Sequence, residues 1–392
     1  MDNSIGGACN ITTGKLDANQ AEVGGRYPFF TCAEYPDSIN SFAFDDDVVL
    51  VAGNNAKGNF HVSRYTGKFN AYQRTYVLTA KSNYDIDFIY YALKLELKRL
   101  RERSQGSQTK FLTMPILTGI QLQDIDNDEQ QVVADVLKAI DKKIDCNNRI
   151  SSEIEEMIKT VFDYWFVQFD FPDSNGKPYK TSGGEMAYNA TLKRDIPANW
   201  TDGNVLSVAD LLGGGTPSKK KAEYWGGDIP FFTPTDADGA VFKYSTEDHI
   251  TELGLKESST KLFNKNTVFI SARGSVGKLL LTGVDMAMNQ SCYALRAKQG
   301  ISHTYLYFLV KELIHHLKVK ASVSGSVFNS IVTNDIEFTN LSIPTKEVVQ
   351  KFAVIAEPMF EQIANNTRQN QQLTQLRDWL LPMLMNGQVT VK

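Results

Sequence analysis

Two loops in the second half of the chain combine glycine with positive charge. Residues 213–221 begin with three glycines and end with three lysines, and residues 272–278 contain Arg273 and Lys278 among glycines. Glycine lets a backbone approach a ligand closely, and lysine and arginine pair with phosphate oxygens. Such loops suit contact with a nucleic acid. A lysine run is also typical of a solvated turn, and the second loop could be a plain hairpin.

The residues that could do other chemistry do not form a known motif. The loop at 272–278 departs from a phosphate-binding P-loop, because Ala272 replaces its first glycine and Leu279 replaces its serine or threonine. Five histidines and four cysteines are scattered without the spacing of metal ligands. We therefore expect no catalytic residue, no cofactor and no metal.

The chain repeats one pattern twice. Aromatic and apolar segments of the first half recur in the same order in the second half. The matched segments are 27–31 with 229–233, 48–52 with 268–272, 73–76 with 290–293, and 88–91 with 305–308. Gln73 and Gln290 are equivalent in this match, and each could be either a binding residue or a core amide.

Each copy ends in apolar residues spaced three and four apart, the pattern of a long coiled-coil helix. Both helices carry a polar interruption at the same place, Asn147 in the first and Asn366 in the second. Pro358 predicts a kink or a break in the second helix. The predicted coiled-coil seam consists of Val133, Leu137, Ile140, Ile144, Ile154 and Ile158 in the first helix, and Phe352, Met359, Ile363, Leu373 and Leu380 in the second.

These patterns predict an α+β protein with two similar α/β domains, residues 1–125 and 201–345. Long helices at 126–170 and 346–392 follow the domains, and a polar linker at 171–200 joins the copies. The helices should form an antiparallel coiled coil that relates the domains by a pseudo-two-fold axis. Two DNA half-sites about 34–36 Å apart would suit such a molecule. A coiled-coil scaffold whose end domains bind protein partners suits it equally well, and an enzyme is a third possibility.

Several motifs in this order resemble the DNA-specificity subunit of type I restriction-modification enzymes. The resemblance spans nearly the whole chain. It rests on residues 214–218, 224–231 and 273–278 in the second domain, and on 129–131, 165–170 and 376–382 in the helices. The first domain matches less well, since it has Thr12-Thr13-Gly14-Lys15 in place of Gly-Thr-Pro-Ser and lacks the Arg-Gly pair.

The resemblance implies a cytoplasmic subunit without chemistry of its own. It would bind a two-part, asymmetric site in double-stranded DNA, with one half per target recognition domain. Two adenine-N6 methyltransferase subunits would dock on the helices, and restriction subunits would join in the full complex. In agreement, the chain lacks the Asn/Asp-Pro-Pro-Tyr/Phe tetrapeptide of adenine methyltransferases. No segment has the roughly 20 apolar residues of a membrane span.

The candidate DNA contacts are polar residues of the loops in both copies. Amides suit adenine and arginine suits guanine, so loops of different composition could bind different bases. The candidates are Lys15, Thr31, Asn54, Asn55, Lys57, Gln73, Arg74 and Lys110 in the first copy, and Thr216, Ser218, Lys219, Lys220, Thr233, Arg273, Ser275, Lys278, Gln290 and Asn329 in the second.

The net charge of −4 argues against a nucleic-acid partner until it is divided along the chain. Residues 126–170 hold five basic and eleven acidic residues, whereas residues 1–125 hold 13 of each and residues 171–345 hold 18 and 17. The negative charge thus belongs to the first helix, and the two domains are near neutral. We expect the chain to bind DNA weakly alone and to gain phosphate attraction from its partners.

Overall fold

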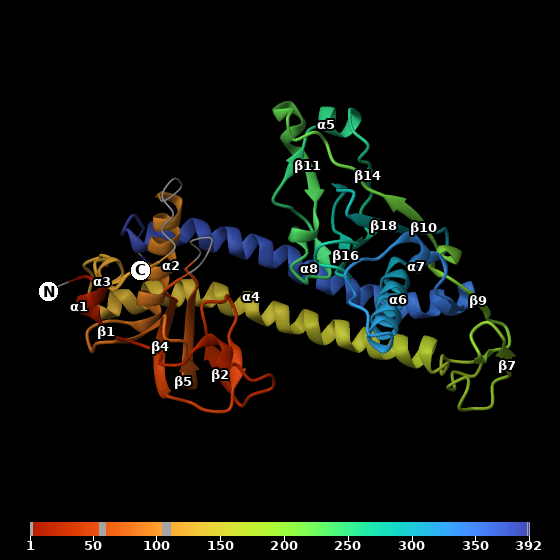
Figure 1. Cartoon of the computed structure of the whole chain (residues 1–392), viewed down its shortest axis with the longest axis horizontal. Helices are drawn as coiled ribbons and strands as arrows, with labels where there is room; N and C mark the ends of the chain where they lie inside the picture. Colours follow the sequence, from red (N-terminus) through yellow and green to blue (C-terminus); the bar gives the residue numbers. More distant parts are fainter. Residues whose placement is uncertain (1–2, 55–59, 104–110, 390, 392) are drawn as a thin grey trace. The chain divides into compact units, whose positions relative to one another are not determined.

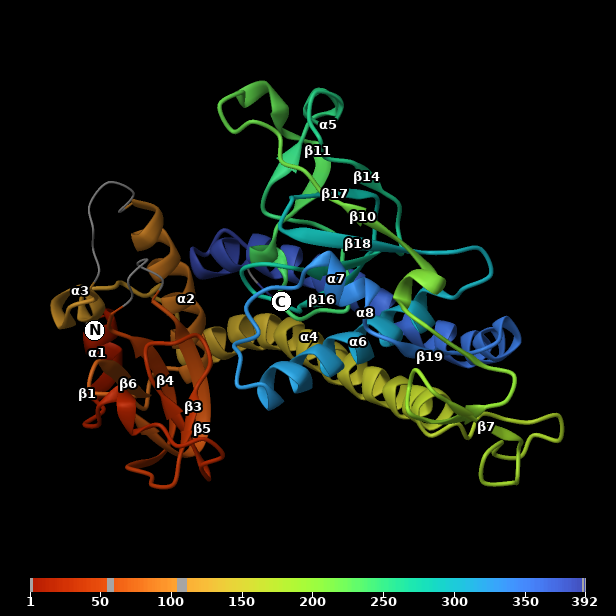
Figure 2. The ribbon, with the colours of Figure 1, turned by 45° about the vertical axis from the view of Figure 1, so that its right-hand side comes forward.

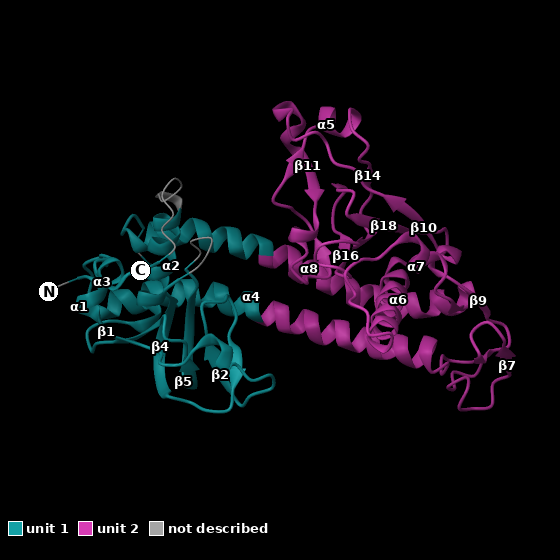
Figure 3. Ribbon diagram, viewed as in Figure 1, with its two compact units in different colours: residues 1–145, 371–392 teal, residues 146–370 magenta. Residues whose placement is uncertain are grey.

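Two long helices, α4 (Asn127–Phe162) and α8 (Lys346–Met385), are the longest elements of the computed structural model (Figure 1). The structure describes residues 3–54, 60–103, 111–389 and 391. The chain divides into two units, residues 1–145 with 371–392 and residues 146–370 (Figure 3). Each long helix therefore contributes to both units.

Unit 1 is built on one sheet of six strands in the order β1-β6-β4-β5-β2-β3. Figure 2 shows this sheet beside helix α2. Helix α2 (Ile86–Arg103) packs against one face, where Val49 and Val51 are buried, while Val48 and Leu50 are buried on the other. Because successive strand residues point to opposite faces, this continuous apolar run fits a strand covered on both sides. The strands are β1 (Cys9–Thr13), β2 (Tyr27–Phe30), β3 (Asp37–Ile39), β4 (Phe44–Ala52), β5 (Val62–Ala71) and β6 (Thr75–Ala80), with short helices α1 (Ile5–Ala8) and α3 (Met114–Thr118).

Unit 2 repeats this strand order. Its sheets run β10-β18-β15-β16-β12 and β13-β11-β17-β14, with two small sheets, β19-β9 and β7-β8. The main strands are β10 (Ala209–Gly213), β11 (Trp225–Phe232), β12 (Phe242–Lys243), β13 (His249–Ile250), β14 (Leu262–Phe263), β15 (Val268–Ser271), β16 (Leu279–Thr282), β17 (Met286–Met288) and β18 (Cys292–Ala297). The small sheets contain β7 (Met186–Asn189), β8 (Arg194–Pro197), β9 (Thr201–Gly203) and β19 (Leu341–Ile343), and the helices are α5 (Glu252–Lys256), α6 (His303–Val323) and α7 (Thr333–Glu337).

The repeat predicted from the sequence is visible in the topology. Strand register corrects one matched segment by a residue. Ala52 and Ser271 are equivalent, because they pair with Thr75 and Cys292, so residues 48–52 correspond to 267–271 and not to 268–272. Strands β1, β6, β4 and β5 of unit 1 correspond to β10, β18, β15 and β16 of unit 2, and α2 corresponds to α6. The single strand β5 pairs with both β4 and β2, whereas its counterpart is divided into β16 and β17, which pair with β15 and β11. The second copy thus has the same design with an interrupted strand.

Helices α4 and α8 run antiparallel within each unit, as predicted. In unit 1, Arg377 Nη1 donates to Asp141 Oδ1 at 2.8 Å. In unit 2, Asn147 Nδ2 donates to Asn370 Oδ1 at 2.8 Å, and Asn366 Nδ2 donates to Ser151 Oγ at 3.1 Å.

The polar interruption forms a buried hydrogen-bonded layer. Asn147 is 1% exposed and Asn366 is 5% exposed. Adding 219 to the numbers of Asn147 and Ser151 gives Asn366 and Asn370, so the two hydrogen bonds are equivalent pairs in the repeat. Buried polar pairs of this kind fix the register of a helix pair.

None of the predicted seam residues is exposed. Val133, Leu137, Ile140, Ile158, Phe352 and Ile363 are buried, and Ile144, Ile154, Met359, Leu373 and Leu380 are half-buried. Of the two alternatives predicted at Pro358, a kink or a break, the break does not occur, because α8 continues through this residue. Pro358 is exposed, and so is Val354, whose carbonyl loses its usual helical donor there and can bond to water instead.

The segment 171–200 folds onto unit 2. It contains the β7–β8 hairpin, and its residues Phe171, Ile196 and Trp200 are buried in the core of the unit. The rings of Phe171 and Trp200 stack with centroids 5.3 Å apart. Among the described helices, none has the length and apolar character that crossing a membrane requires.

Candidate nucleic-acid interface

Strand register gathers several loops at one end of the unit 1 sheet. Strands β1 and β4 end beside the start of β6, with Thr13 paired to Tyr76 and Ala52 paired to Thr75. Strand β2 ends beside the end of β5. The loops after β1, β2 and β4 therefore meet the β5–β6 turn, residues 72–74, which carries two of the predicted residues, Gln73 and Arg74.

Main-chain hydrogen bonds hold this turn in place. The Gln73 N–H donates to the carbonyl of Leu16 at 2.9 Å, and the Gly53 N–H donates to the carbonyl of Arg74 at 2.8 Å. The Gln73 and Arg74 side chains are exposed, and Gln73 Nε2 donates to Asp17 Oδ1 at 2.7 Å. The Arg74 guanidinium lies 5.7 Å from the ring centre of Phe111. Two exposed polar side chains are thus presented on a fixed backbone.

Unit 2 gathers the equivalent loops. Strands β10 and β15 end beside the start of β18, where Ser271 pairs with Cys292, and β11 ends beside the end of β17. The Ala272 N–H donates to the carbonyl of Ser291 at 2.9 Å, which matches the Gly53–Arg74 bond of unit 1. Gln290 is exposed, and the Thr216 hydroxyl donates to its Oε1. Since both glutamines are exposed, neither is a core amide.

The loop 272–278 is a tight turn that presents its polar tip. Gly274 and Gly277 have φ of 81° and 75°, which favour glycine. The buried Ser271 hydroxyl accepts from the Lys278 N–H at 2.9 Å and donates to the carbonyl of Ser275, so it closes the loop from inside. Arg273 and Ser275 are exposed at the tip.

Glycine is required where the loops after β10 and β1 approach the neighbouring turn. A Cβ on Gly214 would lie 2.5 Å from the carbonyl oxygen of Met288 and closer still to that of Asn289. A Cβ on Gly14 would clash in the same way with the carbonyl of Ala71. This close contact keeps the first loop of each unit against the turn that carries Gln73 or Gln290.

The predicted residues do not all meet at these turns. Lys219 lies beside Trp225, with its Nζ 5.5 Å from the ring centre and 3.9 Å from Asp248 Oδ2. Ser218 accepts the Trp225 indole N–H through its carbonyl at 3.2 Å. Lys220 is the exposed neighbour of this pair. Ser218 and Lys219 thus form a separate group beside Trp225.

The other candidates have mixed surroundings. The Thr31 hydroxyl donates to Asp37 at 3.4 Å, the Thr233 hydroxyl donates to Asp236 at 2.8 Å, and Lys278 Nζ donates to the carbonyl of Ala237 at 2.6 Å. Lys15 and Asn329 are exposed and Asn54 is half-buried. Asn55, Lys57 and Lys110 lie outside the described residues.

Sequence reasoning missed residues that shape these turns. Asp17 accepts from Gln73, and Asn289 accepts the Ser291 N–H at 3.0 Å. Ser291, which occupies the position of Arg74, has its own side chain half-buried at the turn. The repeat match already aligned Ser291 with Arg74, and that alignment was the available signal.

A network of charged side chains in unit 1 holds secondary-structure elements together. Arg64 Nε donates to Asp87 Oδ1 at 2.7 Å and Arg64 Nη2 donates to Asp47 Oδ2 at 2.9 Å, while Lys138 also pairs with Asp87. Burial raises the pKa of Asp87, but the hydrogen bonds from Lys138 and Arg64 outweigh it, so the pKa lies below its usual range. The hydrogen bond from Arg64 lowers the pKa of Asp47. These residues join β4, β5 and α2 to α4.

The described residues include no group of three or more histidine, cysteine, aspartate or glutamate side chains that could hold a metal ion. All four cysteines are free. Burial raises the pKa of Cys292, beside the β17–β18 turn, to about 12, so this thiol stays protonated. The chemistry available at the turns is hydrogen bonding. Their exposed polar side chains can donate and accept hydrogen bonds, and the backbone that carries them is held in place.

Comparison with known proteins identifies this arrangement. The family described as type I restriction modification DNA specificity domain matches residues 2–156 and 197–375. The chain is 25% identical over 408 residues to the type I restriction enzyme EcoDI specificity subunit of Escherichia coli, an alignment that covers 99% of this chain and 88% of that protein.

Two further proteins agree. The chain is 27% identical over 321 residues to the type I restriction enzyme MjaIX specificity subunit of Methanocaldococcus jannaschii, covering 78% of this chain and 69% of that protein. The crystal structure of the type I restriction-modification S subunit from M. genitalium has the same fold, with a TM-score of 0.57 and 15% identity over 97% of this chain and 95% of that one. With a family match over most of its length and two units that share one strand order, the chain belongs to the DNA-specificity subunits of type I restriction-modification systems.

Proposed function

We propose that each loop cluster recognises one half of a bipartite, asymmetric site in double-stranded DNA. The recognition domains are residues 1–125 and 201–345, joined through the helical segments 126–170 and 346–392 and the segment 171–200. As a specificity subunit, the chain is the non-catalytic component of its enzyme. It acts in the cytoplasm, where its DNA is.

The observation that carries this proposal is the duplicated turn after β5 and β17. Gln73 and Gln290 occupy equivalent exposed positions, and they suit adenine in the major groove. The next residue differs, being Arg74 in unit 1 and Ser291 in unit 2. Arginine pairs with guanine through two hydrogen bonds, whereas serine is less selective. The two units therefore present different hydrogen-bonding groups on the same scaffold, as an asymmetric site requires.

Methyltransferase subunits, two in number, are the proposed partners of the helices, and restriction subunits join them in the full complex. Helix α8 exposes large apolar side chains in each unit, with Leu376 at 44% and Trp379 at 58% in unit 1, and Val354 at 77% and Ile355 at 44% in unit 2. Exposed tryptophan and aliphatic groups on a helix are typical of a protein-binding surface.

A domain exchange tests the proposal. Residues 201–345 are replaced by the corresponding segment of another specificity subunit, and the complex with methyltransferase is assayed by mapping N6-methyladenine on DNA. We expect one half of the methylated sequence to change and the other to stay. A change in both halves or in neither would exclude one half-site per domain. Binding to protein partners without any DNA affinity would instead indicate a scaffold.

A further inference from the structure

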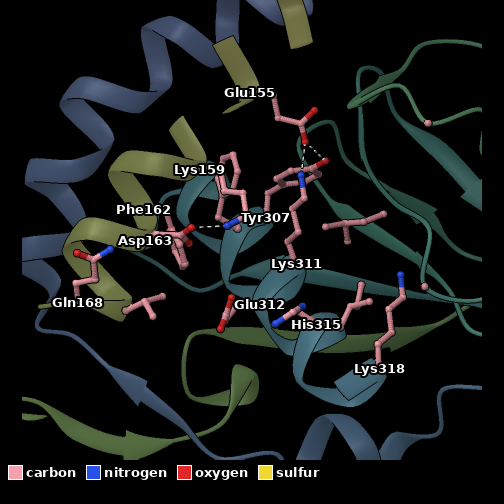
Figure 4. Close-up of a pocket in the computed structure, with 16 residues that line it drawn as sticks. Glu155, Lys159, Phe162, Asp163, Gln168, Tyr307, Lys311, Glu312, His315 and Lys318 are labelled. Carbon is pink, nitrogen blue, oxygen red and sulfur yellow. Dashed lines mark hydrogen bonds and ion pairs between the residues drawn. The ribbon is translucent and has the colours of Figure 1, made fainter. Parts of the chain in front are cut away.

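A basic stripe runs along the helix that follows β6 in unit 1. Lys94, Lys98 and Arg101 on α2 are spaced four and three residues apart, so they lie on one face of the helix. The sequence repeat aligns them with Lys311, His315 and Lys318 on α6 of unit 2. Figure 4 shows these three side chains along one side of α6.

Each stripe lines a groove in its own unit. In unit 1 a cavity of about 390 Å³ lies between the stripe and residues 60–62 at the start of β5. His61 and Glu34 also line this cavity.

The groove of unit 2 has about 700 Å³ and a similar wall (Figure 4). Gly277, just before β16, and Leu279, its first residue, line this groove together with Lys311, His315 and Lys318. Acidic side chains also line this groove: Glu155 on α4, Asp163 just after α4, and Glu312 on α6. Glu155 accepts from Lys311 Nζ at 2.7 Å, and Asp163 pairs with Lys159. Lys318 lies at the Gly277 end of the groove.

Strand register shows that the two grooves are equivalent. Val51 pairs with Val62, and Ile270 pairs with Leu279. The Ala52 N–H donates to the His61 carbonyl at 2.9 Å, just as the Ser271 N–H donates to the Lys278 carbonyl at 2.9 Å. The two grooves thus lie between the same strand start and the same helix face. Lysine side chains therefore line the equivalent groove in both copies, Lys94 and Lys98 in unit 1 and Lys311 and Lys318 in unit 2.

The groove of unit 2 is continuous with the loop 272–278. A Cβ on Gly277 would lie 3.2 Å from Ile314 Cγ2 and 3.6 Å from Lys318 Cε. A strand of nucleic acid that reached the loop tip at Arg273 would leave a neighbouring phosphate near this groove.

We propose that the two grooves hold the phosphodiester backbone of the DNA beside each half-site, with Lys98 and Lys318 as phosphate contacts. This inference rests on the proposed function. The contacts add affinity without adding sequence preference, because a phosphate is the same next to every base. Each such contact releases about 0.9 counterions from double-stranded DNA.

The test uses the full complex with methyltransferase and DNA that contains the methylated sequence. Binding is measured by fluorescence anisotropy from low to high salt for K98Q, K318Q and the double variant. We expect the slope of log affinity against log salt to become shallower by about 0.9 for each single variant and about 1.8 for the double. Affinity at 0.15 M salt falls about five-fold per lysine. The methylated sequence stays the same, and K98R and K318R keep the original slope.

Lys177→Gln, which removes an exposed charge from the segment 171–200, is the matched control and keeps the slope. Slopes for K98Q and K318Q equal to that of the control, or a changed methylated sequence, would overturn the inference. Loss of inorganic phosphate binding in K98Q with an unchanged DNA slope would assign the groove to a small anion and overturn it also. Failure of the unaltered complex to bind DNA would instead contradict the proposed function.

Discussion

At the scale of single residues, main-chain atoms hold the two turns in place, and the predicted contact side chains on them are exposed. The bonds that hold them, from Gly53 to Arg74 and from Ala272 to Ser291, are made by main-chain atoms. The side chains of Gln73, Arg74 and Gln290 are exposed. Glycine at positions 14 and 214 lets the first loop of each unit approach the backbone of the neighbouring turn closely.

We expect Gly214→Ala to destabilise unit 2. The new methyl group would overlap the carbonyl oxygens of Met288 and Asn289, and neither backbone group can move freely. Such overpacking costs about 1–3 kcal/mol. Gly213→Ala is the control, because nothing lies within 4 Å of the corresponding Cβ position. Urea denaturation should show a lower midpoint for G214A alone, and equal midpoints would refute this account.

At the scale of elements, the repeated heptads and their shared interruption predicted the helix pair well. A polar residue in an apolar seam is informative because burial without a partner would be costly. The structure supplies the partners, since Asn147 bonds to Gln369 and Asn370. Helix α8 continues through Pro358 without a break, because this exposed position tolerates proline better than the local rule allows.

Replacing Asn147 with alanine should weaken the helix pair. The change leaves the side chains of Gln369 and Asn370 without the donor that bonds to them at 2.7 Å and 2.8 Å. Loss of hydrogen bonds at a buried site costs about 1–3 kcal/mol. Ser152→Ala, at an exposed position of α4, should stay within about 0.5 kcal/mol of the parent protein. Equal unfolding free energies for N147A and S152A would contradict a stabilising polar layer.

The candidate contacts were harder to predict than the helices. Glycine and basic residues singled out the candidate loops in the sequence, but strand register decides which loops lie together. Ser218 and Lys219 follow the glycines in sequence and yet lie beside Trp225. Asp17 contributes to the Gln73 turn from 56 residues away, a contact that no local pattern contains. Periodicity is a local property, whereas the composition of a binding surface depends on long-range pairing.

At the scale of the whole molecule, charge is distributed unevenly along the chain. The segment 126–170 carries the excess of acidic residues, and in unit 1 Arg64 and Lys138 are engaged by Asp47 and Asp87. Arg64 and Lys138 are therefore engaged within unit 1, and residues 1–125 and 171–345 are near neutral in net charge.

The isolated chain should accordingly bind DNA weakly, and its complex with methyltransferase should bind much more tightly. Phosphate contacts dominate affinity, so the salt slope of the complex should be steeper than that of the chain alone. Anisotropy titrations of both species at several salt concentrations measure this. An isolated chain that binds as tightly as the complex, with the same slope, would show that the partners add no phosphate contacts.

The main-chain bonds that hold the β5–β6 and β17–β18 turns have an evolutionary consequence. Because Gly53 and Ala272 bond to carbonyl oxygens, which every amino acid possesses, the residues at positions 74 and 291 are free to vary without loss of the scaffold. Under the proposed function, substitution there changes the chemical group offered to the DNA while the main-chain bonds of the turn remain. On that proposal, a lineage acquires a new target sequence through single codons, and the two halves of the target diverge independently.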